Sequence, residues 1–363
     1  MVLYRKYRPQ TFSEIIGQEN IIKTLENEIK QDKIAQAYLF TGPRGLGKTT
    51  VARLVAKAVN CENRKKGQSE PCNQCFNCQA IMRGHFLDLI EMDAASQTGV
   101  DNVRENIIAS TRIPPSRGKY KVFIIDEVHM LSIAAFNALL KTLEEPPSYI
   151  IFILATTEIH KVPETIISRC QRFDFVKVDL EKIVKRLENI AALEKIKIAP
   201  EALQTIAQRS EGCVRDAESL LSQVMALDEK EITIEQAEIV IPLTKLNLII
   251  EFAEKIFKKN KKEAISQINQ LLEEGIDLEQ FTKDLVEFLR KILLVKIGID
   301  EKKILIYFDS VTKNKIQELV KSIEIKKLVE IVEEFILVQQ GLSYAEIPQL
   351  PLELAVIKVC SDF

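Results

Sequence analysis

The ten residues Thr41-Gly42-Pro43-Arg44-Gly45-Leu46-Gly47-Lys48-Thr49-Thr50 satisfy the pattern G-x-x-x-x-G-K-[ST]. A short apolar run at 37–40 predicts a buried strand before them, and residues 51–59 predict a helix after them. Glycines in such a loop let backbone N–H groups turn toward phosphate oxygens, and the start of the helix adds partial positive charge. Lys48 is expected to reach the β- and γ-phosphates of a nucleotide, and the Thr49 hydroxyl to ligate Mg²⁺. The stretch therefore predicts a phosphate loop, the alternative being a chance glycine-rich turn.

A second apolar run, at 121–127, ends in the two carboxylates Asp126 and Glu127. A continuous run of this kind fits a strand buried on both faces of a parallel sheet. Asp126 at the end of the strand suits Mg²⁺ held through water, and Glu127 suits a base that polarises the attacking water. The alternative for Glu127 is a solvated strand end. His129 is interpreted as a packed neighbour, and with three histidines in the chain no Ser-His-Asp arrangement can be argued.

The remaining pattern predicts the fold. Further strands are expected at 86–92, 149–155 and about 171–176, with a helix at about 100–111 and another that Ser132 caps. Five strands alternating with helices through about residue 178 predict a doubly wound α/β sheet with its ligand at the carboxyl ends of the strands. From Asp179 to Ile241 the pattern is wholly helical, and from Pro242 it is helical again without a chemical motif. We predict a nucleotide-binding domain at 1–178, a helical lid domain at 179–242 and a third helical domain at 243–363 that serves as a scaffold or association surface.

Four of the seven cysteines crowd into the segment 61–80: Cys61, Cys72, Cys75 and Cys78, with the spacing C-x10-C-x2-C-x2-C. In a cytosolic protein such a pattern favours a metal site over a disulfide. Four thiolates can close a tetrahedral Zn²⁺ site with no open position, which predicts a structural zinc module. An iron–sulfur cluster is the main competitor, but Met82 stands where a ferredoxin has a further cysteine. The scattered Cys170, Cys213 and Cys360 are expected to be buried packing residues.

Composition limits the function classes. The formal net charge of −2 argues against a generally basic nucleic-acid binder, so any nucleic-acid contact must come from a local patch or from assembly. No apolar run approaches the length of a membrane span, and residues 1–6 open no signal peptide, so we expect a cytoplasmic protein without membrane contact. The basic, aromatic segment 4–9 is either a nucleic-acid arm or a lid over a nucleotide base, with Ile15 and Ile16 as its apolar floor.

Together these motifs resemble the AAA+ ATPases, and more narrowly the gamma/tau subunits of bacterial DNA polymerase III, the motors of the sliding-clamp loader. The resemblance covers residues 1–240 strongly and the C-terminal helices by position alone. The segments that carry it are 4–12, the phosphate loop, the four cysteines after its helix, 93–96 (Asp-Ala-Ala-Ser), 125–131 (Ile-Asp-Glu-Val-His-Met-Leu), 136–147 and 168–170 (Ser-Arg-Cys).

The resemblance implies roles for individual residues. Arg169 would be an arginine finger acting on ATP held by the neighbouring subunit, whereas without the resemblance it would be interpreted as a surface salt bridge. Thr157, in preference to Thr156, would be sensor 1, and Arg215 would be sensor 2. Glu127, Lys48 and Arg169 would then be catalytic, and Thr49 and Asp126 would hold magnesium. The nucleotide would also contact Gly42, Pro43, Arg44, Gly45, Leu46, Gly47 and Thr50, and Tyr4, Arg8, Ile15 and Ile16 would frame the adenine.

The resemblance also implies partners and cofactors. These are ATP, Mg²⁺, Zn²⁺, the delta and delta-prime subunits, further copies of the chain in a pentamer joined by a C-terminal helical collar, the beta sliding clamp and primer–template DNA. DNA would be held through its phosphates without base readout. Arg104, Lys141 and Thr165 match positions that contact the template strand, but Gln97 and Gly99 stand where a relative has basic side chains.

Two questions stay open at this point. The longer form in this family carries a C-terminal extension, and the chain ends at Phe363, so it is either a short form or a truncated piece. Alternative functions are a nucleotide-gated scaffold that binds ATP without hydrolysing it, and another AAA+ machine such as a branch-migration motor or an initiator. No polymerase active site is expected in this chain.

Overall fold

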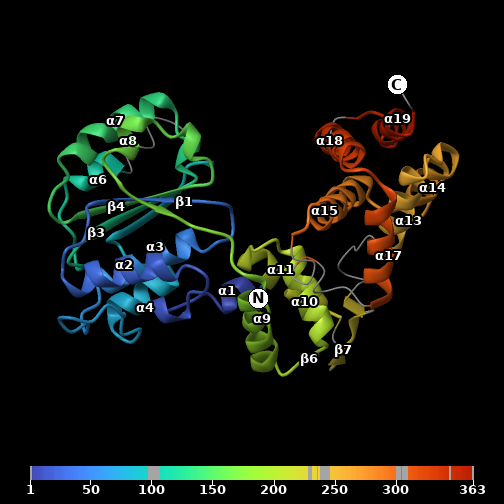
Figure 1. Cartoon of the computed structure of the whole chain (residues 1–363). Coiled ribbons are helices and arrows are strands. Elements are labelled where there is room, and N and C mark those ends of the chain that lie inside the picture. Colours follow the sequence, from blue (N-terminus) through green and yellow to red (C-terminus); the bar gives the residue numbers. More distant parts are fainter. Residues whose placement is uncertain are drawn as a thin grey trace. The chain divides into compact units, whose positions relative to one another are not determined.

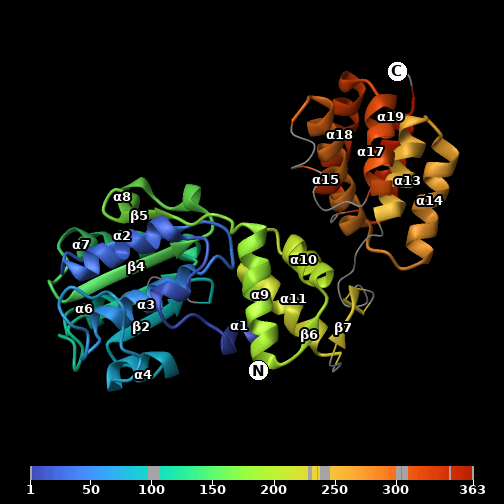
Figure 2. The same cartoon turned by 60° about the horizontal axis from the view of Figure 1, so that its bottom comes forward.

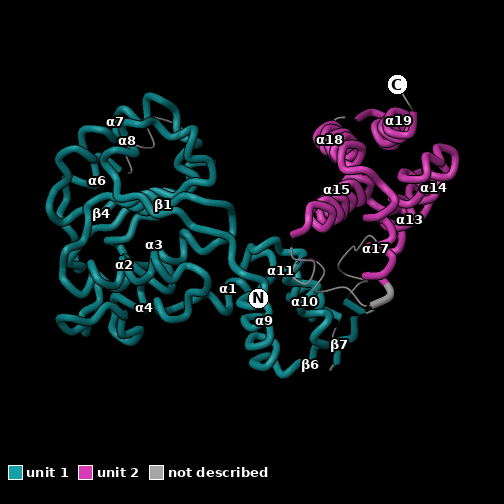
Figure 3. The backbone as a smooth tube through the Cα atoms, viewed as in Figure 1, with its two compact units in different colours: residues 1–241 teal, residues 242–363 magenta. Residues whose placement is uncertain are grey.

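The structure, a computed structural model, describes residues 2–96, 107–227, 231–234, 236–237, 246–299, 304, 310–342 and 345–361. It divides the chain into two compact units, residues 1–241 and 242–363 (Figure 3). Each unit has its own hydrophobic core, so each is described by itself. The predicted helix at 100–111 is described only from residue 107, and the residues Arg104, Gln97 and Gly99 lie outside the described ranges.

The first unit is built on a five-stranded parallel sheet. Its strands are β1 (Ala37–Thr41), β2 (Leu89–Asp93), β3 (Lys121–Asp126), β4 (Ile150–Thr156) and β5 (Gln171–Asp174), in the order β2-β3-β4-β1-β5. The five predicted strands and the predicted α/β class are therefore confirmed. The ends of neighbouring strands lie in register, with Thr41 opposite Thr156 and Asp93 opposite Asp126, so polar side chains that follow the strands gather at one edge of the sheet.

Helices cover both faces of this sheet (Figure 1). Alternate strand residues divide between two cores: Tyr38 and Phe40 pack with α2 (Glu19–Lys30) and α3 (Lys48–Val59), and Leu39 packs with α7 (Ile133–Glu144). Shorter helices are α6 (Ala109–Thr111), α8 (Glu164–Ile167) and α4 (Phe76–Arg83), the last within the cysteine segment. Among the described residues of this unit, the 3₁₀ turns are η1 (Phe12–Glu14), η3 (Val128–Met130) and η4 (Ile159–Lys161).

Strand β2 begins at Leu89, three residues later than predicted. Residues 86–89 form a turn closed by Leu89 N and the Phe86 carbonyl, and the Asp88 carboxylate in it accepts hydrogen bonds from Ser116 N (2.7 Å), Ser116 Oγ (2.9 Å), Arg117 N (2.8 Å) and Gly118 N (2.7 Å). Although burial acts in the opposite direction, these donors hold the pKa of Asp88 below its ordinary value. The carboxylate thus fixes the loop before β3.

Residues 180–225 form three helices, α9 (Leu180–Glu194), α10 (Pro200–Arg209) and α11 (Val214–Met225), which pack together beside the N-terminal α1 (Leu3–Lys6) (Figure 2). The sequence pattern from Asp179 to Ile241 predicts helices alone. This prediction is wrong at two places, because β6 (Lys197–Ile198) pairs in parallel with β7 (Glu231–Ile232). A strand of two residues is too short to leave a periodic pattern in the sequence.

The second unit contains only helices among its described residues. They are α13 (Leu246–Phe257), α14 (Lys261–Glu273), α15 (Leu278–Lys296), α17 (Ser310–Ser322), α18 (Ile325–Gly341) and α19 (Leu350–Val359). Three rings meet in its core: Phe252 lies 5.2 Å from Phe281 and 6.2 Å from Phe335 between centroids, both in edge-to-face arrangements. In the described part of the chain, no helix combines the length and the apolar character that crossing a membrane requires.

Candidate functional site

The loop between β1 and α3 has the backbone geometry that its glycines predict. Gly42, Gly45 and Gly47 all have positive φ angles, of 135°, 77° and 94°. A Cβ atom on Gly42 would lie 2.4 Å from the carbonyl oxygen of Phe175, and one on Gly45 would lie 2.1 Å from Cys213 Sγ. Side chains are therefore excluded at both positions by conformation and by space.

Lys48 is the first residue of α3 and is 6% exposed. Its Nζ donates to the carbonyl oxygens of Gly42 (2.7 Å) and Pro43 (2.8 Å). Burial lowers the pKa of Lys48, and the nearby carboxylates of Glu127 and Asp126 act in the opposite direction. The loop thus holds a largely desolvated cation where an anionic ligand would stabilise it.

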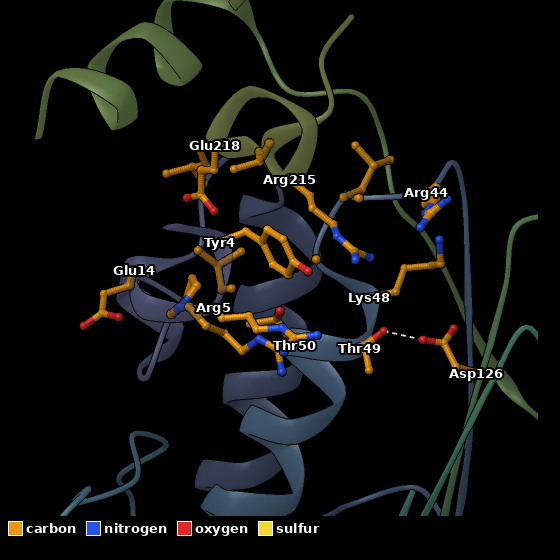
Figure 4. Close-up of a pocket in the computed structure, with 18 of the residues that line it drawn as sticks. Tyr4, Arg5, Glu14, Arg44, Lys48, Thr49, Thr50, Asp126, Arg215 and Glu218 are labelled. Carbon is orange, nitrogen blue, oxygen red and sulfur yellow. Dashed lines mark hydrogen bonds between the residues drawn. The ribbon is translucent and has the colours of Figure 1, made fainter. Parts of the chain in front are cut away.

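Two motifs far apart in the sequence meet at this point. Thr49 Oγ1 donates to Asp126 Oδ2 at 2.6 Å, as the dashed line in Figure 4 shows. The next residue, Glu127, has a left-handed backbone with φ 47° and ψ 44°, and its Oε2 accepts from Thr157 Oγ1 at 3.0 Å. A hydroxyl and a carboxylate side by side supply oxygen ligands of the kind that Mg²⁺ takes, and the second carboxylate lies next to them.

These groups line a cavity of about 480 Å³ in the first unit (Figure 4). The predicted residues on its wall are Tyr4, Arg8, Ile15, Ile16, Arg44, Gly45, Leu46, Gly47, Lys48, Thr49, Thr50, Asp126, Glu127 and Arg215. Gly42, Pro43 and Thr157 are not on the wall, but they hold Lys48 and Glu127 by the hydrogen bonds above.

Seven further residues line the cavity that the sequence did not single out for this site: Arg5, Pro9, Glu14, Asp93, Arg186, Val214 and Glu218. The most informative are Arg186 on α9 and Glu218 on α11. Arg186 Nε donates to Glu218 Oε1 at 3.0 Å and Nη2 donates to the Tyr7 carbonyl at 2.5 Å. Burial raises the pKa of Glu218, although Arg186 opposes the shift. This pair ties α9, α11 and the segment after α1 together at the end of the cavity away from the phosphate loop.

Tyr4 and Arg215 form the side wall of the cavity. The Arg215 guanidinium lies 4.6 Å from the centroid of the Tyr4 ring, and Figure 4 shows its side chain reaching toward the phosphate loop. Hydrogen bonding with Arg215 lowers the pKa of Tyr4. An aromatic ring with a cation on its face is a surface on which a nucleobase can lie.

His129 is packed, as the sequence predicts, and among polar groups. Its ring is 6% exposed, with Nδ1 at 3.1 Å from Thr156 Oγ1 and Nε2 at 3.2 Å from Glu158 Oε1. Thr156 Oγ1 also accepts a hydrogen bond from Glu158 N at 3.0 Å. The Thr156 hydroxyl therefore contacts His129 and Glu158, whereas the Thr157 hydroxyl contacts Glu127.

Arg169, Lys141 and Thr165 do not line the cavity. Arg169 is exposed and pairs with Glu144 (2.5 Å) and with the Thr165 carbonyl (2.7 Å), which is the salt bridge that the sequence without the resemblance predicts. Lys141 on α7 and Thr165 on α8 are exposed.

The four clustered cysteines are brought together. Their Sγ atoms all lie within 4.8 Å of one another. Backbone N–H groups donate to three of the sulfurs: Cys61 accepts from Cys72 N (3.3 Å), Cys72 from Gln74 N (3.4 Å) and Cys75 N (3.2 Å), and Cys75 from Cys78 N (3.5 Å). Despite the opposing effect of burial, such donors lower the pKa of Cys72 to about 6. A set of four sulfurs with N–H groups directed at them fits a structural zinc ion.

The three scattered cysteines are predicted to be buried. Cys360 is buried, as predicted, whereas Cys170 and Cys213 are only half-buried. Burial raises the pKa of Cys170 to about 12 and that of Cys213 to about 11. Cys213 Sγ lies 3.3 Å from the Arg44 carbonyl, so it packs on the phosphate loop itself.

A parallel sheet with a phosphate loop, a strand-end carboxylate bonded to that loop and helices that close on the same cavity define the P-loop class of nucleotide-binding proteins. Three family profiles match the chain: "DNA polymerase III, delta subunit" over residues 17–179, "DNA polymerase III clamp loader subunit, ATPase lid domain" over 182–229, and "DNA polymerase III subunits gamma and tau domain III" over 232–363. The chain belongs to the DNA polymerase III gamma/tau family.

Individual relatives support this assignment. DNA polymerase III subunit gamma of Buchnera aphidicola subsp. Acyrthosiphon pisum is 36% identical over 99% of this chain and 98% of its own length. DNA polymerase III subunit tau of Bacillus subtilis is 43% identical over 99% of this chain, and that of Escherichia coli is 41% identical over 82%. The matches cover 63% and 46% of these two tau subunits, so the chain spans about half to two thirds of their length.

Proposed function

We propose that this chain is the ATP-hydrolysing motor of a bacterial sliding-clamp loader, working within the DNA polymerase III holoenzyme without a polymerase site of its own. The observation that carries the proposal is the meeting of Lys48, Thr49, Asp126 and Glu127 on the wall of one cavity, in a chain of the gamma/tau family. A cavity of about 480 Å³ has the size of a small-molecule site and accommodates a nucleotide.

Four side chains at the phosphate end of the cavity have different roles. Lys48 leaves the carbonyls of Gly42 and Pro43 and binds the β- and γ-phosphates, whose charge restores the stability of its ammonium group. Thr49 and Asp126 hold Mg²⁺, which neutralises phosphate charge when bound. Glu127 accepts a hydrogen bond from the attacking water and orients it, and Thr157 keeps the Glu127 carboxylate in position.

The other end of the cavity recognises the base. Tyr4, Arg8, Ile15 and Ile16 frame the adenine, and Arg215 extends from α11 as sensor 2 toward the γ-phosphate. Because Arg215 belongs to the lid, its contact with the γ-phosphate couples ATP binding to the position of α11 and so to the conformation of the unit.

The remaining assignments follow from the family. We assign residues 1–178 to the nucleotide-binding domain, 179–242 to the lid and 243–363 to a collar that joins copies of this chain with delta and delta-prime in a hetero-pentamer. The cysteine cluster holds structural zinc in a module at about 61–80. The ring acts in the cytoplasm on the beta clamp and primer–template DNA, with Lys141, Thr165 and Arg104 as DNA contacts. Arg169 leaves Glu144 and completes the site of the neighbouring subunit.

Replacement of one carboxylate tests the proposal. In the assembled loader with clamp and primed DNA, Glu127→Gln should lower ATP turnover by about 100-fold or more while ATP binding persists, because only the orientation of water is lost. Glu91→Gln is a matched control, since Glu91 is also a carboxylate on a strand of this sheet and pairs with Arg53, outside the ATP cavity. Normal hydrolysis by the Glu127 variant would overturn the role given to Glu127, whereas ATP binding without turnover by the wild-type loader would favour a nucleotide-gated scaffold.

A further inference from the structure

The first unit has a second cavity, of about 410 Å³, away from the ATP site. It lies where the end of α3, the start of the cysteine segment, α4 and the loop before β3 come together. One wall residue, Cys61, belongs to the cysteine cluster, and none takes part in ATP hydrolysis as proposed above. Two features of its wall, a pair of buried amides and a group of cations, indicate a ligand.

Asn60 and Asn77 are 3% and 2% exposed, and both lie on the wall. Asn60 Oδ1 accepts from Tyr120 N at 2.9 Å and Asn77 Nδ2 donates to the Asn60 carbonyl at 2.9 Å, which fixes the orientation of both amides. The opposite atoms, Asn60 Nδ2 and Asn77 Oδ1, are buried and have no hydrogen-bond partner among the described residues. Buried polar atoms are rarely left unpaired, so one donor and one acceptor of wall residues lack the partners that such atoms normally have.

Four cations surround these amides: Arg64, Lys66, Arg117 and Lys119. Two carboxylates, Asp32 and Glu62, lie on the same wall, which leaves a net charge of +2 from the charged side chains. Arg64 is 8% exposed and is held by carbonyl oxygens and Asp32. Among the described residues Lys66 has no hydrogen-bond or ion-pair partner, so its ammonium group is available.

The loop that carries Arg117 and Lys119 is held rigidly. Asp88 accepts the three consecutive N–H groups of residues 116–118. A Cβ atom on Gly118 would lie 2.6 Å from Asn60 Oδ1, so the loop approaches the buried amide more closely than any other residue would allow. The Arg117 guanidinium lies 3.9 Å from the centroid of the Phe76 ring, which orients it beside the cavity. The loop backbone and the Arg117 side chain are thus positioned beside the cavity, where Arg117 lies 3.5 Å from Glu62 and Lys119 lies 3.9 Å from Asp32.

We propose that this cavity binds a phosphate-bearing ligand of nucleotide size. Lys66, Arg117 and Lys119 bind the phosphate oxygens, and Asn60 and Asn77 bind a group that both accepts and donates, such as a sugar hydroxyl or the edge of a base. Inorganic phosphate alone would fill too little of the volume and would leave the Asn77 oxygen unpaired. The same phosphate chemistry comes from a free nucleotide or from the end of a nucleic-acid strand.

Binding to the full chain tests this site separately from the ATP site. With Lys48→Ala present to weaken the phosphate loop, calorimetric titrations with AMP, with pyrophosphate and with a 5′-phosphorylated oligothymidine compare the two sources. Lys66→Glu and Lys119→Glu should each weaken binding of at least one probe by about tenfold, the effect of losing one charge-assisted contact. Lys65→Glu is the matched control, because Lys65 is the exposed neighbour of Lys66 and does not line the cavity.

Each outcome decides the matter. Binding of AMP assigns the site to free nucleotides, binding of the oligonucleotide alone assigns it to strand ends, and binding of pyrophosphate alone overturns a ligand of nucleotide size. No binding of any probe, or an equal loss in the Lys65 control, overturns the proposal. In the chain with Lys48 intact, Lys66→Glu should leave ATP turnover within about twofold of the wild type, so failure here is distinguishable from failure of the proposed function.

Discussion

The backbone of Glu127 is held in the left-handed region, which is uncommon for a residue with a side chain. Such a conformation costs on the order of 1–3 kcal/mol and persists only where the surroundings fix it. Hydrogen bonds fix it here, from Glu127 N to Asp126 Oδ1 at 2.9 Å, from Met130 N to the Glu127 carbonyl at 2.9 Å and from Thr157 to the side chain, and His129 Nδ1 lies 3.5 Å from the same Glu127 Oε2. We infer that the strain aims the carboxylate into the cavity, so that its direction depends on Thr157.

Replacing Thr157 tests this dependence. Thr157→Val keeps the shape and removes the hydroxyl donor, so kcat for ATP hydrolysis should fall about tenfold with little change in KM, because one hydrogen bond that positions the base is lost. Thr157→Ser should restore most of the rate. Equal rates in the valine and wild-type proteins would show that the contact has no part in turnover.

The residues of the site that the sequence could predict are those of local motifs. Lys48 and Thr49 follow from the loop pattern, and Asp126 and Glu127 from a strand end. Arg186 and Glu218 carried no such signal, because they come from two helices that meet only in the folded lid, and a charged residue on a helix normally indicates a solvated face. Tyr4 and Arg215 were assigned only through resemblance, since nothing local connects residues so far apart in the chain.

At the scale of elements, the predictable parts were those with long periodic patterns. Strands β3 and β4 are buried along nearly their whole length, which produces the continuous apolar runs that identify them. The start of β2 and the pair β6–β7 could not be predicted, because one depends on the contacts of Asp88 with a loop thirty residues away and the other on tertiary pairing of two-residue strands.

Asp88 should make a pH-dependent contribution to stability. Asp88→Asn replaces the carboxylate, which only accepts hydrogen bonds, by an amide whose NH₂ group would face N–H donors. The free energy of unfolding of the first unit should therefore fall by about 2–3 kcal/mol at neutral pH. The folded pKa of Asp88 lies below its ordinary value of 3.8, so the advantage of the wild type is complete above 3.8 and is lost as the pH falls through the folded value. Urea unfolding of both proteins should therefore differ equally at pH 8 and at pH 5 and converge in acid. If the difference in free energy of unfolding between the two proteins stayed unchanged at pH values below 3.8, this account would be contradicted.

The cysteine cluster should contribute stability only with its metal. Removal of zinc by a chelator should lower the Tm of the first unit by about 5 °C or more, since metal binding is coupled to folding of the segment that it closes. Cys72→Ser should reproduce the loss and abolish the effect of the chelator, whereas Cys170→Ser, which changes a cysteine outside the cluster, should retain it. Elemental analysis that finds iron in place of zinc would assign the cluster to iron–sulfur chemistry.

At the scale of the whole molecule, the chain combines a unit that carries both cavities with a helical unit that has no chemical motif among its described residues. The sequence predicted a change of character at residue 242, and the division between the compact units falls there. It also predicted a domain boundary at 178, which remains a prediction, because the sheet and the lid lie in one compact unit and share the ATP cavity.

Sharing of sites between copies is testable by mixing mutants. Rings that combine Arg169→Ala protomers with Lys48→Ala protomers should hydrolyse more ATP than rings of either mutant alone, because some interfaces then join an intact Arg169 to an intact Lys48. Turnover is measured across mixing ratios with the other loader subunits held constant. Activity equal to that of the single-mutant rings at every ratio would leave Arg169 as the surface salt bridge seen with Glu144.

The tight approach of the lid to Gly45 has a mechanical consequence. Arg215 N donates to the Gly45 carbonyl at 3.3 Å, Cys213 Sγ rests on Arg44, and no free space separates the two segments. A peptide that rotates to admit phosphate cannot do so without displacing the first turn of α11. Movement of the phosphate loop on binding a triphosphate is therefore passed directly to the first turn of α11, and so to the lid.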